Sequence, residues 1–165
     1  MDNPIINSTH EELFLKRMNY LKNMLEKALH EPFLNFSQIS LIDEMGLYLI
    51  YDDAELLYIG MTTRDGCVRL GEMCSGYRSH TFNRKLLAQH FRGLGHEMHV
   101  VNPKTFHKLW IETEIISKSD LKEAQRAVNN KIRQRLRFRF YKTRDIQLEH
   151  LELFAIATLQ PLYNF

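Results

Sequence analysis

Several side chains stand out because their types suit the hydrolysis of a phosphodiester bond. Two tyrosines lie in the mirrored tripeptides Gly46-Leu47-Tyr48 and Tyr58-Ile59-Gly60. Further along the chain come Arg69, His80, Glu152 and Asn164. Phosphodiester hydrolysis needs a base for the attacking water, cationic groups for the charge on the phosphoryl oxygens, and help for the leaving oxygen. The set contains a candidate for each of these needs.

Glu152 is the candidate ligand for a metal ion. Mg²⁺ keeps most of its waters and commonly takes one or two protein carboxylates with a phosphate oxygen, so a single glutamate suffices. On a helix, the neighbours of Glu152 one turn away are Leu148, Ala155 and Ile156. We therefore expect its side chain to leave the apolar stripe and point toward the domain body. Glu149 is the alternative ligand.

The two tripeptides lie in a predicted β-hairpin. Residues 46–51 and 56–60 are rich in β-branched and aromatic side chains, and Asp52-Asp53 between them is typical of a turn. A third strand is indicated by arginines at every second position from Arg133 to Arg139, because the apolar residues between them give a period of two. This pattern predicts a strand with one cationic and one apolar face.

An amphipathic helix is predicted ahead of the hairpin. Ser8 or Thr9 can cap its start, because a glutamate follows each of them three residues later. The helix runs to about Leu29 with apolar residues at helical spacing, namely Phe14, Met18, Leu21, Leu25 and Ala28. We expect this stripe to pack in the core, with a dimer interface as the alternative.

The remaining segments complete an α+β pattern. The predicted elements are a short helix at 68–73, a helix at 81–91, one or two strands within 96–117 broken at Pro103, a helix from Ser119 or Asp120 to about Arg133, and a helix from Asp145 to Leu159. The order predicts one domain over residues 1–165, with a small central antiparallel sheet (the hairpin plus a third strand) flanked by helices. Residues 1–40 form an N-terminal helical extension.

Composition bounds the class of protein. The chain has 165 residues, 44% of them hydrophobic, which suits one folded domain. Cys67 and Cys74 lack the spacing of a zinc site, and we interpret them as reduced thiols in a cytoplasmic protein. The start of the chain resembles neither a signal peptide nor a membrane span, so we expect no membrane contact.

Charge is distributed unevenly although the net charge is only +2. Residues 31–63 contain six carboxylates and no Lys or Arg, whereas residues 122–144 hold nine Lys and Arg against the single Glu123. This asymmetry predicts one electropositive face that contacts phosphates, although alternating charges on a strand are more often a solvent face. The candidate DNA-binding cations are Arg78, Arg84, Lys85, Arg133, Arg135, Arg137 and Arg139.

Together, the two tripeptides and the residues that follow them resemble the GIY-YIG nuclease superfamily. The likeness extends from Gly46 to the closing Gln160-Pro-Leu-Tyr-Asn164 segment and keeps the family's order. It implies a metal-dependent endonuclease that uses Mg²⁺ or Mn²⁺ to cleave double-stranded or branched DNA, in one form as a restriction-type enzyme. Cutting both strands with one site per chain would require a homodimer or two sequential events.

The resemblance also implies roles for individual residues. Tyr48 would act as the base or position the attacking water, with Tyr58 beside it. Arg69 would grip a phosphate oxygen and His80 would neutralise phosphate charge or relay a proton. Glu152 would hold the metal. Support for the site geometry is expected from Gly46, Gly60 and Asn164.

Two positions depart from the family pattern. Met61 stands where members often carry Lys, and Met73 where they carry His or Tyr. Compensation could come from His80 or from Arg64, Tyr77 and Arg78. The segment 96–130 is longer than the corresponding part of the family core and is interpreted as an insertion. The alternatives are a catalytically weak nucleic-acid-binding module of the same fold and a protein-interaction domain.

Overall fold

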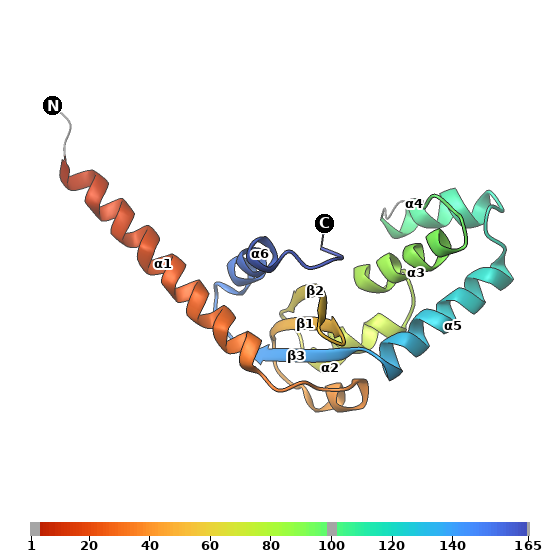
Figure 1. Ribbon diagram of the computed structural model, residues 1–165, viewed down its shortest axis with the longest axis horizontal. Coiled ribbons are helices and arrows are strands. Elements are labelled where there is room, and N and C mark those ends of the chain that lie inside the picture. Colours follow the sequence, from red (N-terminus) through yellow and green to blue (C-terminus); the bar gives the residue numbers. More distant parts are fainter. Residues whose placement is uncertain (1–3, 99–101, 165) are drawn as a thin grey trace.

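The computed structural model describes residues 4–98 and 102–164. Its elements are α1 (Pro4–His30), the 3-10 helix η1 (Phe36–Leu41), β1 (Gly46–Asp52), β2 (Glu55–Thr62), α2 (Gly66–Gly71), η2 (Glu72–Cys74), α3 (Thr81–Gly93), α4 (Pro103–His107), the π-helix η3 (Lys108–Glu112), α5 (Lys118–Gln134), β3 (Arg137–Lys142) and α6 (Leu148–Leu159). The strands form one antiparallel sheet in the order β2-β1-β3 (Figure 1). The predicted α+β class and central sheet are confirmed.

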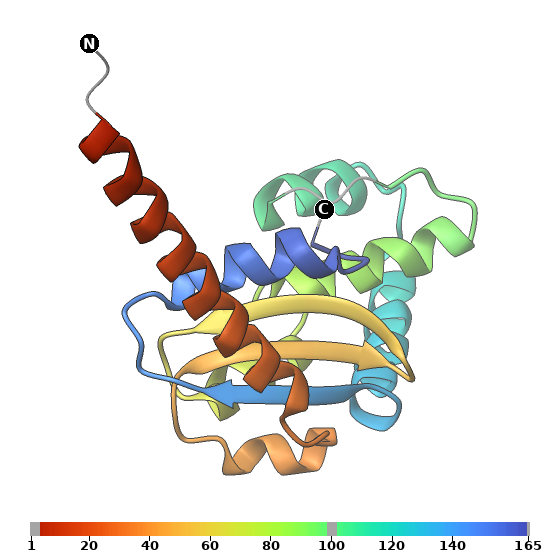
Figure 2. The same ribbon diagram turned by 60° about the vertical axis from the view of Figure 1, so that its left-hand side comes forward.

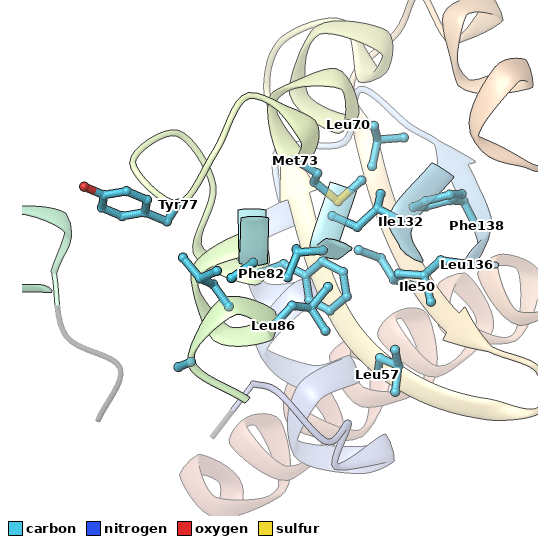
Figure 3. Close-up of a cluster of buried hydrophobic side chains, with 14 of the residues drawn as sticks. Ile50, Leu57, Leu70, Met73, Tyr77, Phe82, Leu86, Ile132, Leu136 and Phe138 are labelled. Carbon is cyan, nitrogen blue, oxygen red and sulfur yellow. The ribbon is translucent and has the colours of Figure 1, made fainter. Parts of the chain in front are cut away.

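The sheet lies between helices on its two faces (Figure 2), and it separates two clusters of buried apolar side chains. Alternate side chains of β1 point to opposite faces, so Tyr48 and Ile50 join one cluster while Leu47 and Leu49 join the other. The first cluster packs against α2, α3 and α5, and Figure 3 shows Phe82 within it beside residues of the strands. The second packs against α1 and α6. All of β1 except Asp52 is buried, as expected for a central strand covered on both faces.

Both edges of the sheet are covered by other segments of the chain. Leu34 pairs with Phe138 on the outer edge of β3 through backbone bonds of 2.7 and 2.8 Å. On the outer edge of β2, Tyr163 N–H donates to the Leu57 carbonyl at 2.8 Å. The C-terminal segment is therefore attached to the strand that carries Tyr58.

The long helix α1 begins earlier than predicted. It starts at Pro4, so Ser8 and Thr9 lie inside it and do not cap it. Its C-terminal half is in the core as expected, with Leu21, Leu25 and Ala28 buried, whereas Phe14 is 61% exposed because the helix extends past the sheet (Figure 1). No helix of the described residues is both long and apolar enough to cross a membrane.

The strands predicted within residues 96–117 are wrong where the structure describes them. Residues 96–98 are not in a strand, residues 99–101 lie outside the described residues, and 103–112 are helical. Helix α4 forms because Asn102 accepts a bond from the Thr105 N–H and Pro103 occupies the first turn. The apolar residues of this segment then bury at helical positions, as Phe106 and Ile111 do.

The segment with alternating arginines, residues 133–139, is also only partly in a strand. β3 begins at Arg137, whereas Arg133 belongs to α5 and Arg135 follows it as the C-cap. Arg135 forms ion pairs with Asp52 at 2.5 Å and with Asp53 at 3.7 Å. The guanidinium of Arg139 lies 4.1 Å from the centre of the Phe33 ring. The predicted face of four arginines therefore does not exist.

Two helix starts differ slightly from the predictions. Ser117 caps α5 instead of Ser119 or Asp120, because its hydroxyl accepts the Asp120 N–H at 3.1 Å. α6 starts at Leu148, after a turn in which the Asp145 carboxylate accepts the Gln147 N–H at 2.7 Å. Capping and turn bonds of this kind decide where each helix begins.

Gly46 and Gly60 let other groups approach the hairpin closely. A Cβ on Gly46 would lie 2.2 Å from the Tyr141 carbonyl oxygen, and one on Gly60 would lie 2.4 Å from the phenol of Tyr48. Tyr48 and Gly60 are cross-strand partners, so the ring lies over the glycine backbone. These glycines are required for packing at the strand that carries Tyr48.

We expect Gly60→Ala to lower the free energy of unfolding by about 1–3 kcal/mol, because the new methyl group would displace the buried Tyr48 ring. Gly71→Ala is the matched control, since a Cβ there meets no atom within 4 Å and the residue is helical. Urea unfolding of both variants measures the difference. Equal stabilities would show that the Tyr48 ring is not held against Gly60.

Candidate active site

The structure brings the predicted aromatic and charged residues together at one end of the sheet. Tyr48 lies on β1, Tyr58 on β2, Arg69 on α2 and Glu152 on α6, while His80 is the N-cap of α3. The Tyr48 ring centre is 6.3 Å from that of Tyr58 and 6.2 Å from that of His80. The charges of Arg69 and Glu152 both act on the two phenols.

Tyr48 is the most buried member of the site, with 1% of its surface exposed. Its hydroxyl oxygen is 3.2 Å from His80 Nε2, and the Arg69 guanidinium lies near enough for its charge to act on the phenol. Burial raises the pKa of Tyr48, and the negative charge of Tyr58 would raise it further, whereas Arg69 lowers it. The effect of burial on the pKa of Tyr48 exceeds that of the Arg69 cation, so without a bound ligand the phenol is protonated at neutral pH.

His80 is a neutral hydrogen-bond donor in this arrangement. Its Nδ1 accepts the Phe82 N–H at 3.1 Å, which places the single ring proton of the neutral form on Nε2, facing Tyr48. Burial lowers the pKa of His80 to about 3, and Arg69 and Arg84 lower it in the same direction. This favours a positioning role for His80, with the positive charge supplied by Arg69.

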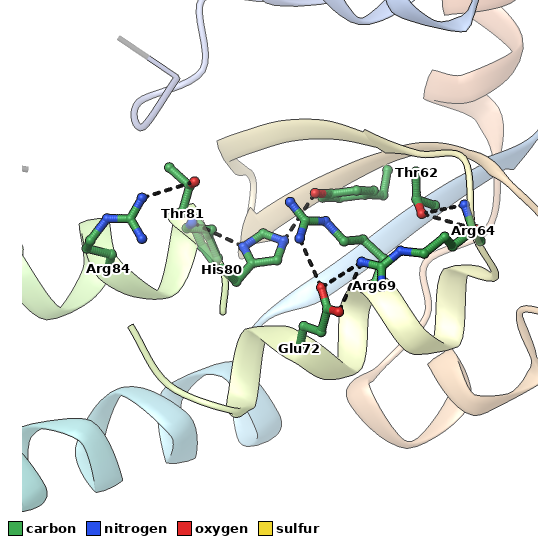
Figure 4. A network of polar contacts seen from close by, with 9 residues as sticks. Thr62, Arg64, Arg69, Glu72, His80, Thr81 and Arg84 are labelled. Atoms are coloured by element: carbon green, nitrogen blue, oxygen red, sulfur yellow. Dashed lines mark hydrogen bonds and ion pairs between the residues drawn. The ribbon is translucent and has the colours of Figure 1, made fainter. Parts of the chain in front are cut away.

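Arg69 is held in place by a residue that sequence reasoning missed. Glu72 accepts hydrogen bonds from Arg69 and Arg64, each at 3.0 Å (Figure 4). Burial opposes ionisation of Glu72, yet the bonds from the two arginines outweigh it and lower its pKa. Glu72 lies three residues after Arg69 on the same helical segment, a spacing that could have identified the pair.

Glu152 reaches the site from the opposite layer of the fold. It accepts a hydrogen bond from the backbone N–H of Met61 on the outer edge of β2. Burial raises the pKa of Glu152, the Met61 bond and Arg69 lower it, and the nearby Glu149 raises it. Glu149 is exposed, so the structure favours Glu152 over Glu149 as the carboxylate of this site.

Asn164 fastens the C-terminal segment to β2 beside Tyr58. Its Nδ2 donates to the Ile59 carbonyl and its Oδ1 accepts the Ile59 N–H, both at 2.8 Å. The side chain thereby makes the two hydrogen bonds that the backbone of a neighbouring strand would make with the outer edge of β2. This geometry supports the expected structural role of Asn164.

The other predicted cations have partners outside this cluster, although the charge of Arg84 also acts on His80 and Tyr58. Arg84 is 7% exposed and donates to the Tyr77 carbonyl at 2.8 Å, so it stabilises the turn before α3. Lys85 donates to the Tyr163 carbonyl in the C-terminal segment. Arg78 contacts Tyr77 and His107, each at 3.2 Å. Arg133 and Arg137 are exposed at other positions on the surface.

The two methionines contribute differently to the site. Met73 is fully buried in the cluster with Leu70 and Phe82 (Figure 3), where its side chain contributes to packing and supplies no charge or hydrogen-bond donor to the site. Met61 contributes its backbone N–H to Glu152. Of the residues suggested as compensation, His80 and Arg64 join the polar network, whereas Tyr77 contacts His107 instead.

The arrangement combines a carboxylate, an arginine and two phenols, which suits an anionic substrate. The Tyr48 oxygen accepts a bond from His80 Nε2, so its own proton points elsewhere and can meet another group. In the described part of the chain, no three His, Cys, Asp or Glu side chains gather to hold a metal. A metal at this site would therefore bind Glu152, water and substrate oxygens, which suits Mg²⁺.

Comparison of the chain with protein-family models, with curated proteins and with solved structures finds no match. The functional assignment therefore depends on the site itself. Its strongest feature is the convergence of Tyr48, Arg69, His80 and Glu152 from separate elements of the fold.

The protonation of His80 predicts a pH dependence of stability. The folded protein keeps His80 neutral down to about pH 3, whereas the unfolded chain binds a proton near pH 6.5. Between these values the unfolded state holds more protons, so the free energy of unfolding falls as the pH falls, by up to about 1.4 kcal/mol per pH unit. His80→Asn keeps a capping oxygen and should weaken this dependence.

Urea unfolding between about pH 7 and pH 5 measures the effect. His10→Asn is the matched control because His10 is exposed on α1, and its curve should run parallel to that of the wild type. A His80→Asn curve that also runs parallel to the wild type would contradict the neutral, buried state of His80.

Proposed function

We propose that the protein is a metal-dependent endonuclease that hydrolyses phosphodiester bonds in DNA, in one form as a restriction-type enzyme. The observation that supports this most is the position of the Glu152 carboxylate beside Arg69 and the buried phenol of Tyr48. A group that orients water, a cation for the phosphate and a carboxylate for a metal all contribute to phosphodiester hydrolysis.

Each residue has a distinct part in the proposed reaction. Arg69, oriented by Glu72, binds a non-bridging oxygen of the scissile phosphate and stabilises the charge that develops on it. His80 donates to Tyr48 and fixes the direction of the phenol. The Tyr48 hydroxyl hydrogen-bonds and orients the attacking water, and the Tyr58 ring stacks beside that of Tyr48. As the water oxygen bonds to phosphorus, the bond from phosphorus to the leaving oxygen breaks. The proton of the water passes to solvent, and the leaving oxygen takes a proton from solvent.

The proposed metal is Mg²⁺ or Mn²⁺. Glu152 fits this role because its carboxylate is partly buried and has the Met61 N–H as its hydrogen-bond partner, which leaves other oxygen lone pairs for a cation. A bound ion would supply Lewis-acid stabilisation of the phosphoryl oxygens. Binding would also oppose the effect of burial on the carboxylate, because a cation favours its ionised form.

A DNA-binding module without activity is the second candidate. The burial of Met73 favours it, since no polar side chain stands there one turn after Arg69. The partly buried carboxylate of Glu152 argues for cleavage instead, because a negative charge beside a bound phosphate weakens simple binding. The two candidates differ in whether DNA is cut when metal is added.

Nicking of supercoiled plasmid tests the proposal. We expect the wild type to cut with Mg²⁺ or Mn²⁺ but not with a chelator, and Glu152→Gln to lose activity by about 100-fold or more. Glu149→Gln is the matched control, because it removes an exposed carboxylate from the same helix, and it should keep most activity.

Branched substrates should be assayed in parallel with the plasmid. If the protein binds DNA but every substrate stays intact in every lane, the nuclease proposal is contradicted and the DNA-binding module is supported. Equal loss in Glu152→Gln and Glu149→Gln would contradict the assignment of Glu152 as the metal ligand.

A further inference from the structure

A groove runs along one face of α5 beside the turn of residues 75–78. Its volume is about 550 Å³. The helix contributes the residues at positions 118, 121, 122, 125, 126, 129, 130 and 133, which all fall on one side at helical spacing. The sequence predicts a cationic strand face over Arg133–Arg139 and an excess of cations over residues 122–144, and the structure places a row of these cations on α5.

Five cations line this groove, namely Arg78, Lys118, Lys122, Arg126 and Arg133. None of them forms an ion pair with a carboxylate within the residues that the structure describes. The acidic residues of α5, Asp120 and Glu123, do not line the groove. The groove is therefore strongly positive and has no internal neutralisation.

This arrangement is costly for the helix by itself. Lys118, Lys122 and Arg126 follow one another at a spacing of four residues, where like charges lie side by side and destabilise a helix. Other cations of the same region are neutralised, as Lys131 is by Asp52 at 3.2 Å. An anionic partner would relieve the repulsion along the groove.

A polar network holds the floor of the groove rigid. Gln125 accepts the Tyr77 N–H at 3.1 Å and donates to the buried Asn83 at 3.0 Å. Asn129 donates to the Cys74 carbonyl at 3.0 Å. These bonds fix α5 against the turn that leads to His80, and Arg78 in this turn precedes His80 by two residues. The groove and the candidate active site are thus connected through one short segment.

We propose that this α5 groove binds the phosphate backbone of duplex DNA next to the scissile phosphate. The inference rests on the proposed function. From Lys118 to Arg133 the helix spans about 22 Å at 1.5 Å per residue. That length corresponds to about six base-pair rises of 3.4 Å along the axis of a duplex. An acidic protein is the less suitable partner, because stable protein interfaces have an apolar centre and the lining has only two large apolar or aromatic side chains, Leu121 and the buried Tyr77.

The experiment measures binding without cleavage. Fluorescence anisotropy with a labelled duplex of about 30 base pairs, in chelator, gives the affinity over about 50–200 mM salt. We expect Lys122→Gln/Arg126→Gln to bind at least about 10-fold more weakly at 0.1 M salt. The slope of log K against log salt should fall by about 1.8, or 0.9 for each lost phosphate contact.

Lys16→Gln/Lys27→Gln is the matched control, because it removes the same charge from exposed positions on α1 and should bind like the wild type. Equal affinity and slope for the groove variant and the wild type would overturn the proposal. So would binding of poly-glutamate but not of DNA by the wild type, which would indicate an acidic protein partner. Plasmid nicking by Glu152→Gln is scored separately, so failure of the groove and failure of the nuclease assignment are distinguishable.

Discussion

The contact between the Tyr48 ring and the backbone of Gly60 constrains the whole site. The phenol can lie across the β1–β2 pair only because residue 60 has no Cβ. In that position its oxygen reaches both His80 and Arg69, which come from different helical segments on the same face of the sheet. Burial then keeps the phenol protonated and keeps His80 neutral, so Arg69 carries the positive charge of the group.

The outer edge of β2 positions Glu152 and Asn164. A strand at the edge of a sheet has unpaired backbone groups, and here they are used by the C-terminal part of the chain. Met61 donates to Glu152 and Ile59 exchanges two bonds with Asn164. The Glu152 carboxylate comes from α6, which lies with α1 on the opposite face of the sheet from the two phenols. It therefore approaches the phenols at the outer edge of β2. Loss of the C-terminal attachment would disturb the strand that carries Tyr58.

Local sequence patterns predicted the hairpin and the α+β class, because each depends on short-range periodicity, whereas the association of Tyr48 with Glu152 was expected only from the family resemblance. Features set by distant partners could not be read in this way. Arg135 follows an alternating pattern but caps α5 and pairs with Asp52 on β1, and Glu72 gains its role only when Arg64 is brought beside Arg69. Between residues 102 and 112, the cap at Asn102 outweighed an alternation that suggested strands.

The most direct test of the account is a double-mutant cycle on single-turnover cleavage of a duplex in Mg²⁺. The variants are Tyr48→Phe, Glu152→Gln and the combination of both. If the two side chains act on one phosphate in one step, the double variant should be about as slow as the slower single variant. Rate losses that multiply would show that Tyr48 and Glu152 act independently, and a wild type that does not cut DNA would contradict the assignment of a nuclease.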